Sequence, residues 1–247
     1  MNSVSLLPVE NLPEIGPGDD LVGLLSNTQP QLQAGDILVV TQKVVSKAEG
    51  RVIRLASVEP SAKAQEIAQR MDKDPALVEL ILQESQELVR QERGVIVSRT
   101  HHGFVCANAG IDLSNVDGGE SACLLPVDPD GSARNLYEGL RQNLGFSVPV
   151  LISDSFGRPW RQGITNITLG SWGLDPLLDY RGQNDAQGLE MKATVTAVAD
   201  SLSAATELVV GKSTGAGATI IRGYCYVASD SIGFLSTLRP WEQCFFQ

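Results

Sequence analysis

The amino-acid sequence predicts an α+β fold organised around a mixed β-sheet. Apolar runs of strand length, such as residues 36–41 and 149–153, are interspersed with longer segments of helical periodicity, such as residues 74–92. The two kinds of segment do not alternate strictly, which disfavours a doubly wound parallel sheet. The chain of 247 residues shows no internal repeat and no long linker, so we expect one domain over residues 1–247, which two subdomains could share.

The first half of the chain carries signals for both helices and strands. Asp74 followed by Pro75 is typical of the N-cap and first position of a helix, and Asp128 is expected to cap the helix that follows it. The predicted helices lie at residues 61–71, 74–92 and 130–144. The predicted strands lie at residues 36–41, 94–98, 103–107, 122–126 and 149–153.

The second half is less regular. Residues 161–178 are rich in Gly, Thr and Asn, which favours irregular structure around a site. Residues 189–199 alternate β-branched side chains and predict a strand that leads into a helix over residues 200–210. A glycine-rich turn at residues 210–217 then precedes a strand at residues 218–222.

Composition and charge exclude several classes of protein. Hydrophobic residues make up 43% and charged residues 19% of the chain, as expected for a soluble globular protein. The net charge is −10 and no basic stripe is visible, so we expect no binding to nucleic acid. The N-terminus lacks the pattern of a signal peptide, and no apolar run has membrane-spanning length. We therefore expect a cytoplasmic protein without membrane contact, whose four cysteines are reduced thiols.

Two carboxylates at the ends of apolar runs predict a cation site. Asp112 lies just beyond one such run, among two asparagines, a serine and two glycines. Asp154 ends a second apolar run, directly before Ser155. Hard divalent cations prefer oxygen ligands, so carboxylates that meet at the ends of two buried strands can share a metal ion.

The polar segment after the first predicted strand has two interpretations. Lys43, Ser46 and Lys47 follow residues 36–41, at the end of a strand, where α/β proteins tend to bind ligands. They form either cationic and hydroxyl donors for a ligand or an ordinary solvated turn. Sequence alone leaves both interpretations open.

Two later segments also combine cationic side chains with glycines. Arg158 and Arg161 lie close to Asp154 and form either an anion-binding site or a structural salt-bridge corner. Residues 209–214 read VVGKST but lack the first glycine of a P-loop. Lys212 therefore either contacts a phosphate as a point charge or marks the end of a helix.

Taken together, these segments resemble the coenzyme F420-0:L-glutamate ligase (γ-glutamyl ligase) family, in the same order and over nearly the whole chain. The matching segments read LPVENLPEIGPGDDL, GDILVVTQKVVSKAEGR, GFVCANAGIDLSNV, LLPVDPDGSA, SDSFGRPWRQG, GLDPLLDYRG and ELVVGKSTGAGATIIRG. The resemblance implies a γ-glutamyl-ligase-like fold in an intertwined homodimer, and no fused nitroreductase-like domain is expected. It also implies a GTP-dependent ligase that joins L-glutamate to coenzyme F420-0 through an acyl phosphate, with Mg²⁺ or Mn²⁺ and with K⁺ as a further cation.

The resemblance assigns roles to individual residues by position. A first divalent cation is expected on Asp112 and Asp154, and Ser155 is expected to help bind a second. The residues expected to take part in catalysis are Asp112, Asp154, Lys47 and Arg158. The residues expected around the guanine nucleotide are Leu12, Pro13, Glu14, Ile15, Gln42, Lys43, Lys47, Asn115, Gly211, Lys212, Ser213 and Thr214.

Three departures from the family pattern bear on these roles. Gln42-Lys43 replace a Ser-Thr pair of archaeal relatives, and Asn166 replaces an expected aspartate. Lys212 stands where a relative offers an oxygen ligand, which an ammonium group cannot provide. Two other functions therefore stay open: a ligase that acts on a different carboxylate, and a guanine-nucleotide-binding protein without catalysis.

Overall fold

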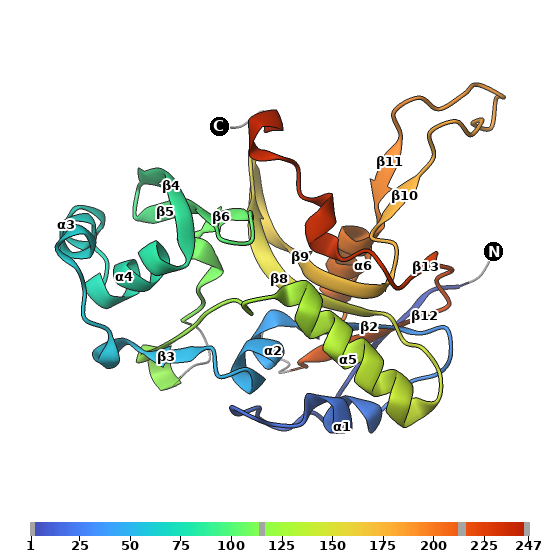
Figure 1. Cartoon of the computed structure of the whole chain (residues 1–247), viewed down its shortest axis with the longest axis horizontal. Helices are drawn as coiled ribbons and strands as arrows, with labels where there is room; N and C mark the ends of the chain where they lie inside the picture. The colour runs from blue at the N-terminus through green and yellow to red at the C-terminus, as the bar shows by residue number, and fades with distance from the viewer. Residues whose placement is uncertain (1–2, 114–116, 212–215, 245–247) are drawn as a thin grey trace.

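The computed structural model describes residues 3–113, 117–211 and 216–244. Its main sheet contains, in spatial order, β1 (Ser5–Pro8), β12 (Ala218–Arg222), β2 (Ile37–Thr41), β8 (Val150–Arg158), β9 (Arg161–Leu174) and β13 (Ala228–Ser229). β2 and β8 run parallel, whereas the other neighbouring pairs are antiparallel. The predicted α+β class with a mixed sheet is therefore confirmed (Figure 1).

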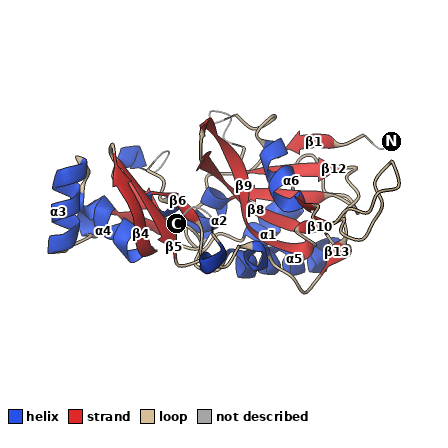
Figure 2. Cartoon of the chain, turned by 90° about the horizontal axis from the view of Figure 1, so that it is seen from above, coloured by secondary structure: helices blue, strands red, loops and turns tan. Residues whose placement is uncertain are grey.

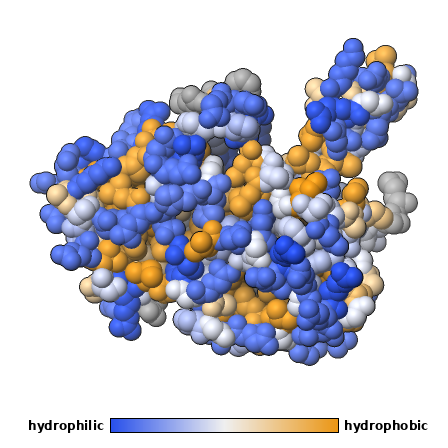
Figure 3. All heavy atoms as spheres, viewed as in Figure 1, coloured by the Kyte–Doolittle hydropathy of each residue, from blue (hydrophilic) through white to orange (hydrophobic). Residues whose placement is uncertain are grey.

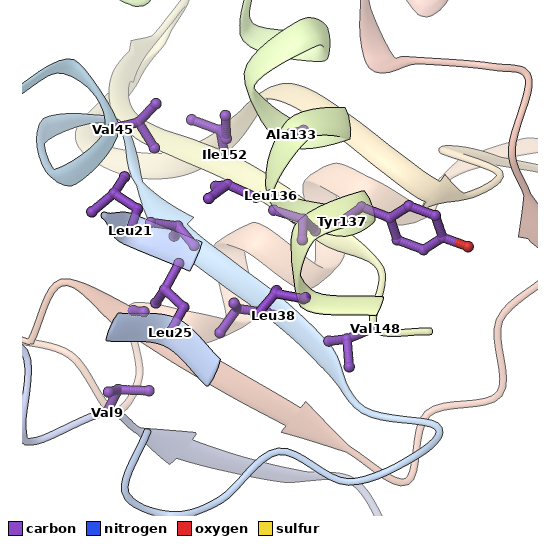
Figure 4. Close-up of a cluster of buried hydrophobic side chains, with 14 of the residues drawn as sticks. Val9, Leu21, Leu25, Leu38, Val45, Ala133, Leu136, Tyr137, Val148 and Ile152 are labelled. Atoms are coloured by element: carbon purple, nitrogen blue, oxygen red, sulfur yellow. The ribbon is translucent and has the colours of Figure 1, made fainter. Parts of the chain in front are cut away.

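Helices cover both faces of the main sheet. One face carries α1 (Leu21–Ser26), α2 (Gln42–Ala48) and α5 (Pro129–Leu144), and the opposite face carries α6 (Val198–Thr206). Leu38 of β2 points into the core beneath the first three helices (Figure 4), as does Val40. Ile37 and Val39 point into the core on the opposite face. Because both faces are buried, β2 reads as a continuous apolar run in the sequence.

Residues 52–113 and 117–123 form a second body beside the main sheet, here called the small lobe (Figures 1 and 2). Its elements are β3 (Val52–Arg54), α3 (Ala62–Met71), α4 (Pro75–Gln83), β4 (Ser85–Glu92), β5 (Val95–Thr100), β6 (Val105–Ala107) and β7 (Ser121–Cys123). β4, β5 and β6 form an antiparallel sheet, and β3 pairs with β7. A separate apolar cluster that includes Ile67, Val78 and Ile96 holds the lobe together.

Residues 177–197 form an arm that projects from the body (Figures 1 and 3). Its base is the strand pair β10 (Leu177–Asp179) and β11 (Val195–Ala197). Short 3₁₀ turns complete the described chain: η1 (Leu55–Ser57), η2 (Asn108–Gly110), η3 (Asp117–Gly119), η4 (Phe234–Thr237) and η5 (Trp241–Gln243). Among the described helices, none has both the length and the apolar character needed to cross a membrane.

Local signals in the sequence located most of these elements. Asp74 caps α4 by accepting the N–H groups of Ala76 and Leu77, and Asp128 caps α5 by accepting the N–H of Gly131. Pro follows the cap in both helices, as expected. The predicted strands at residues 36–41, 94–98, 103–107, 122–126, 149–153 and 218–222 correspond to β2, β5, β6, β7, β8 and β12.

The helix predicted over residues 74–92 is wrong in its second half. α4 ends at Gln83, and residues 85–92 form strand β4 instead. Arg93 and Gly94 have φ values of 52° and 75°, as the two central residues of a type I′ hairpin turn do. This turn folds the segment back onto β5, so that hairpin pairing replaces the helical hydrogen bonds that its sequence favours.

The irregular structure predicted for residues 161–178 is also wrong, because most of this segment is strand β9. Its glycines reflect close packing instead of irregularity. A Cβ atom on Gly170 would lie 2.3 Å from the backbone of Pro129, so only glycine lets β9 pass beneath the start of α5. The strand predicted over residues 189–199 shrinks to β11, and α6 begins at Val198 and ends at Thr206.

Candidate functional site

The point where the parallel pairing of β2 and β8 ends defines the candidate site. Thr41, the last residue of β2, pairs with Ser153 of β8, and β8 continues beyond this point in its hairpin with β9. After Thr41 the chain enters α2, and after Ser153 it continues into Asp154 and Ser155. Both of the latter side chains are half-buried. Ligands tend to bind at this edge of sheets that contain parallel strands.

The small lobe brings Asp112 to the same edge. Its backbone N–H donates to the carbonyl oxygen of Cys123 at 3.0 Å, and the N–H of Cys123 donates back at 2.8 Å. The Asp112 carboxylate forms an ion pair with Lys43 of α2, with 2.8 Å between Nζ and Oδ2. Lys43 therefore links the Asp112 loop to the end of β2.

Most of the polar segment that follows β2 is a helix and not a solvated turn. Gln42 is buried, and its Nε2 donates to Ser46 Oγ at 2.7 Å and to the carbonyl oxygen of Leu124 at 2.9 Å. Ser46 is also fully buried, so it does not offer an outward hydroxyl. The amide of Gln42 thus fixes α2 against the chain around Cys123 and Leu124, and the cations Lys43 and Lys47 form ion pairs with Asp112 and Glu14.

Ser155, directly after Asp154, lies in a hydrogen-bond network that reaches the end of α6. Ser155 Oγ donates to Asn166 Oδ1 at 2.7 Å, and the backbone N–H of Asn166 donates to Glu207 Oε2 at 3.1 Å. Buried beneath Asp154, the Cys106 thiol has its pKa raised to about 12, first by burial and second by the Asp154 charge. Sequence reasoning overlooked Glu207, although this residue opens the last of the family-like segments.

The loop that precedes α1 contacts the C-terminal end of α2. Lys47 forms an ion pair with Glu14, and the N–H of Gly18 donates to the carbonyl oxygen of Ala48 at 2.8 Å. Ile15 is buried in the main core, whereas Pro13 and Glu14 are exposed. Residues 12–15 therefore lie beside Lys47.

The end of the glycine-rich segment meets the same helix. The N–H of Thr41 donates to the carbonyl oxygen of Gly217 at 2.9 Å, and Gly217 lies against Val44 and Leu12. Gly211 is exposed. The predictions for Ser114, Asn115, Lys212, Ser213 and Thr214 concern positions outside the described residues.

Arg158 lies at the end of β8, away from Asp154. It follows Asp154 by four positions in an extended strand, which corresponds to about 13 Å. Its Nη2 donates to the carbonyl oxygen of Gln162 at 2.8 Å within the exposed tip of the β8–β9 hairpin. In this structure it stabilises the hairpin tip.

The side chains at this edge fit a hard divalent cation that also binds a nucleotide. Asp112 and Asp154 offer carboxylate oxygens, and Ser155 can ligate through its oxygen while its proton is donated to Asn166. Within the described residues, no three His, Cys, Asp or Glu side chains gather to hold a metal unaided. Mg²⁺ is usually bound in this way, by one or two carboxylates together with water and phosphate oxygens.

Comparison with known proteins places the chain in a family. A family model described as F420-0:Gamma-glutamyl ligase matches residues 10–223, a range that includes Asp112 and Asp154. Coenzyme F420:L-glutamate ligase from Methanothermobacter thermautotrophicus is 46% identical over 251 residues, which is 99% of each chain. The proteins of the same name from Methanopyrus kandleri and Archaeoglobus fulgidus are 42% and 41% identical, over 90% and 89% of this chain and 89% and 88% of theirs. These matches confirm the resemblance found in the sequence: the chain belongs to the F420-0:gamma-glutamyl ligase family.

Proposed function

We propose that this protein is a ligase that uses GTP and a divalent metal ion to join the amino group of L-glutamate to the terminal carboxylate of coenzyme F420-0, and that γ-glutamyl linkages form when further glutamates are added. The family match supports the reaction class, and the names of the relatives support the two substrates. The observation that carries the proposal is the ion pair of Asp112 with Lys43, which comes two residues after Thr41, whose strand partner Ser153 directly precedes Asp154. Carboxylate and ammonium groups at one edge suit the transfer of a phosphoryl group.

The proposed ligase reaction has two steps. A carboxylate oxygen of F420-0 attacks the γ-phosphorus of GTP, so that an acyl phosphate forms and GDP leaves. The amine of glutamate then attacks the acyl carbon, an amide bond forms, inorganic phosphate leaves, and the amine loses a proton. A divalent cation on Asp112 and Asp154, either Mg²⁺ or Mn²⁺, supplies positive charge that offsets the phosphates.

The residues around α2 act on the nucleotide in this proposal. Lys47 points toward the loop of residues 12–15, where its ammonium group can leave Glu14 and bind a phosphate oxygen. Positive charge aimed at the transferred group lowers the barrier more than it strengthens binding of the ground state. Arg158 can join only if the exposed hairpin tip moves toward the carboxylates.

Replacing Lys47 with methionine tests this arrangement. We expect Lys47→Met to raise KM for GTP and to lower kcat/KM by about 100-fold, since a charged contact to phosphate is lost. The matched control is Lys63→Met, because Lys63 is an exposed lysine on α3. Steady-state phosphate release at varied GTP measures both variants, and equal kinetics would remove Lys47 from the nucleotide site.

We also propose that the protein is a homodimer. The tip of the β8–β9 hairpin supports this, because Trp160 is 81% exposed there and Ile164 is 52% exposed. Contiguous exposed apolar patches are typical of protein–protein contact sites. We expect light scattering to give twice the chain mass, and Trp160→Ser with Ile164→Ser to shift the mass toward the monomer. A monomeric wild-type protein would contradict the proposal.

Reconstitution tests the proposed function as a whole. The purified protein is incubated with GTP, Mg²⁺ or Mn²⁺, L-glutamate and F420-0, and the products are analysed by mass spectrometry and phosphate assay. We expect one phosphate for each glutamyl unit gained. Phosphate release only with another carboxylate would indicate a different acceptor, and nucleotide binding without turnover on any carboxylate would indicate a non-catalytic relative.

A further inference from the structure

Lys43 lies beside the Asp112 carboxylate, in the space that a cation bound to Asp112 would need. Its ammonium nitrogen lies 2.8 Å from Asp112 Oδ2, and the two side chains are only 24% and 34% exposed. Burial raises the pKa of the nearby Cys123 thiol, the Gln42 hydrogen bond and the Lys43 charge lower it, and the Asp112 charge raises it. The pair is therefore a half-buried contact within the candidate site.

An ammonium group and a divalent cation compete for the same carboxylate. Mg²⁺ bonds to a carboxylate oxygen at about 2.0–2.1 Å, so a metal ion on Asp112 would stand within a few ångströms of Lys43 Nζ. Two positive charges at about 4 Å repel each other appreciably even in a high dielectric, and a charge of +2 doubles the effect. Metal binding to Asp112 therefore requires Lys43 to move or to be neutralised.

We infer that Lys43 is a built-in counter-ion of Asp112. Its ammonium group keeps the divalent cation from binding to Asp112 until a nucleotide binds, whose phosphates then bind the ammonium group instead. This inference rests on the proposed function, because it requires a nucleotide and a metal ion at this edge. Lys47 and Glu14 show the same arrangement on the other side of α2, a lysine paired with a carboxylate that a phosphate can replace. The metal ion and the nucleotide then bind favourably only when both are present. This limits GTP turnover when either of them is missing.

Opposite changes in two affinities distinguish this role from a structural one. Lys43→Met keeps the length of the side chain but removes its charge. In nucleotide-free protein we expect it to bind Mn²⁺ about tenfold more tightly than wild type, because the competing charge is gone. In the presence of EDTA we expect it to bind GDP more weakly, because a phosphate contact is lost. If Lys43 had only a structural role, Lys43→Met would weaken the binding of both Mn²⁺ and GDP.

The experiment measures free Mn²⁺ by electron paramagnetic resonance and GDP binding by calorimetry. Lys43→Arg keeps the charge and should resemble wild type, Lys43→Gln should resemble Lys43→Met, and Lys63→Met on the exposed face of α3 is the control. Circular dichroism verifies that each variant is folded. Unchanged or weaker Mn²⁺ binding by folded Lys43→Met and Lys43→Gln would overturn the inference.

Two further variants separate failure of this inference from failure of the proposed function. Asp112→Asn and Asp154→Asn should each weaken Mn²⁺ binding in the same assay. If they do, but Lys43→Met does not tighten it, the metal site stands and the role of Lys43 is wrong. If neither aspartate variant changes Mn²⁺ binding, the proposed metal site and the inference fall together.

Discussion

Replacing Asp154 with asparagine lowers the turnover of the reconstituted ligase by at least about 100-fold, and Asp112→Asn does the same. Each substitution keeps the size of the side chain but removes a negative charge that the proposed cation needs. Asp154 directly follows the last pair between β2 and β8, and Asp112 is joined to the end of β2 through Lys43, so we expect the two losses to have a common cause. Phosphate release and glutamyl transfer should fall together in each variant.

The arm provides a matched control for these variants. Asp185 is an exposed aspartate whose carboxylate accepts N–H groups of Gln187 and Leu189 within the arm. We expect Asp185→Asn to keep most of the wild-type turnover. If Asp112→Asn or Asp154→Asn retains wild-type activity, that residue is not a ligand of the essential cation.

Replacing Asp130 with alanine destabilises the fold by about 3–5 kcal/mol, the largest effect on stability that we expect from a single polar side chain. The Asp130 carboxylate accepts three backbone N–H groups, from Ser171 at 2.9 Å, Phe234 at 2.8 Å and Leu235 at 2.9 Å. It thereby joins the start of α5 to β9 and to η4. Without it, partly buried N–H groups lose their acceptor, and each such loss costs about 1–3 kcal/mol.

Urea unfolding followed by circular dichroism measures this loss of stability. Asp185→Ala is the matched control, because that aspartate also accepts backbone N–H groups but lies in the exposed arm, where water can replace it. We expect its free energy of unfolding to stay within about 1 kcal/mol of wild type. A similar loss in both variants would mean that Asp130 does not join the three segments.

Sequence predicted elements where the signal was local. The caps at Asp74 and Asp128 and the apolar run of β2 depend on neighbouring residues, and all three were found. β4 and β9 were not found, because their conformations depend on partners that pair with them through hairpins. The glycine that looked irregular, Gly170, is explained only by Pro129, which comes from another part of the chain.

For the candidate site, too, the sequence predicted only what depends on local signals. Asp112 and Asp154 could be selected because each follows an apolar run, and the structure brings their segments to one edge of the sheet. The ion pair between Lys43 and Asp112 could not be predicted, because it depends on how the small lobe packs against α2. The contact of Asn166 with Glu207 likewise depends on the packing of α6 on β9.

The transfer of ¹⁸O from substrate to phosphate tests the central claim most directly. F420-0 labelled with ¹⁸O in both oxygens of its terminal carboxylate is incubated with the protein, GTP, Mg²⁺ and L-glutamate, and the released phosphate is analysed by mass spectrometry. If the carboxylate is activated as an acyl phosphate at the edge formed by β2 and β8, each phosphate carries one ¹⁸O atom, and Asp154→Asn abolishes the transfer. Phosphate without ¹⁸O, released while the glutamyl product forms, would contradict the account.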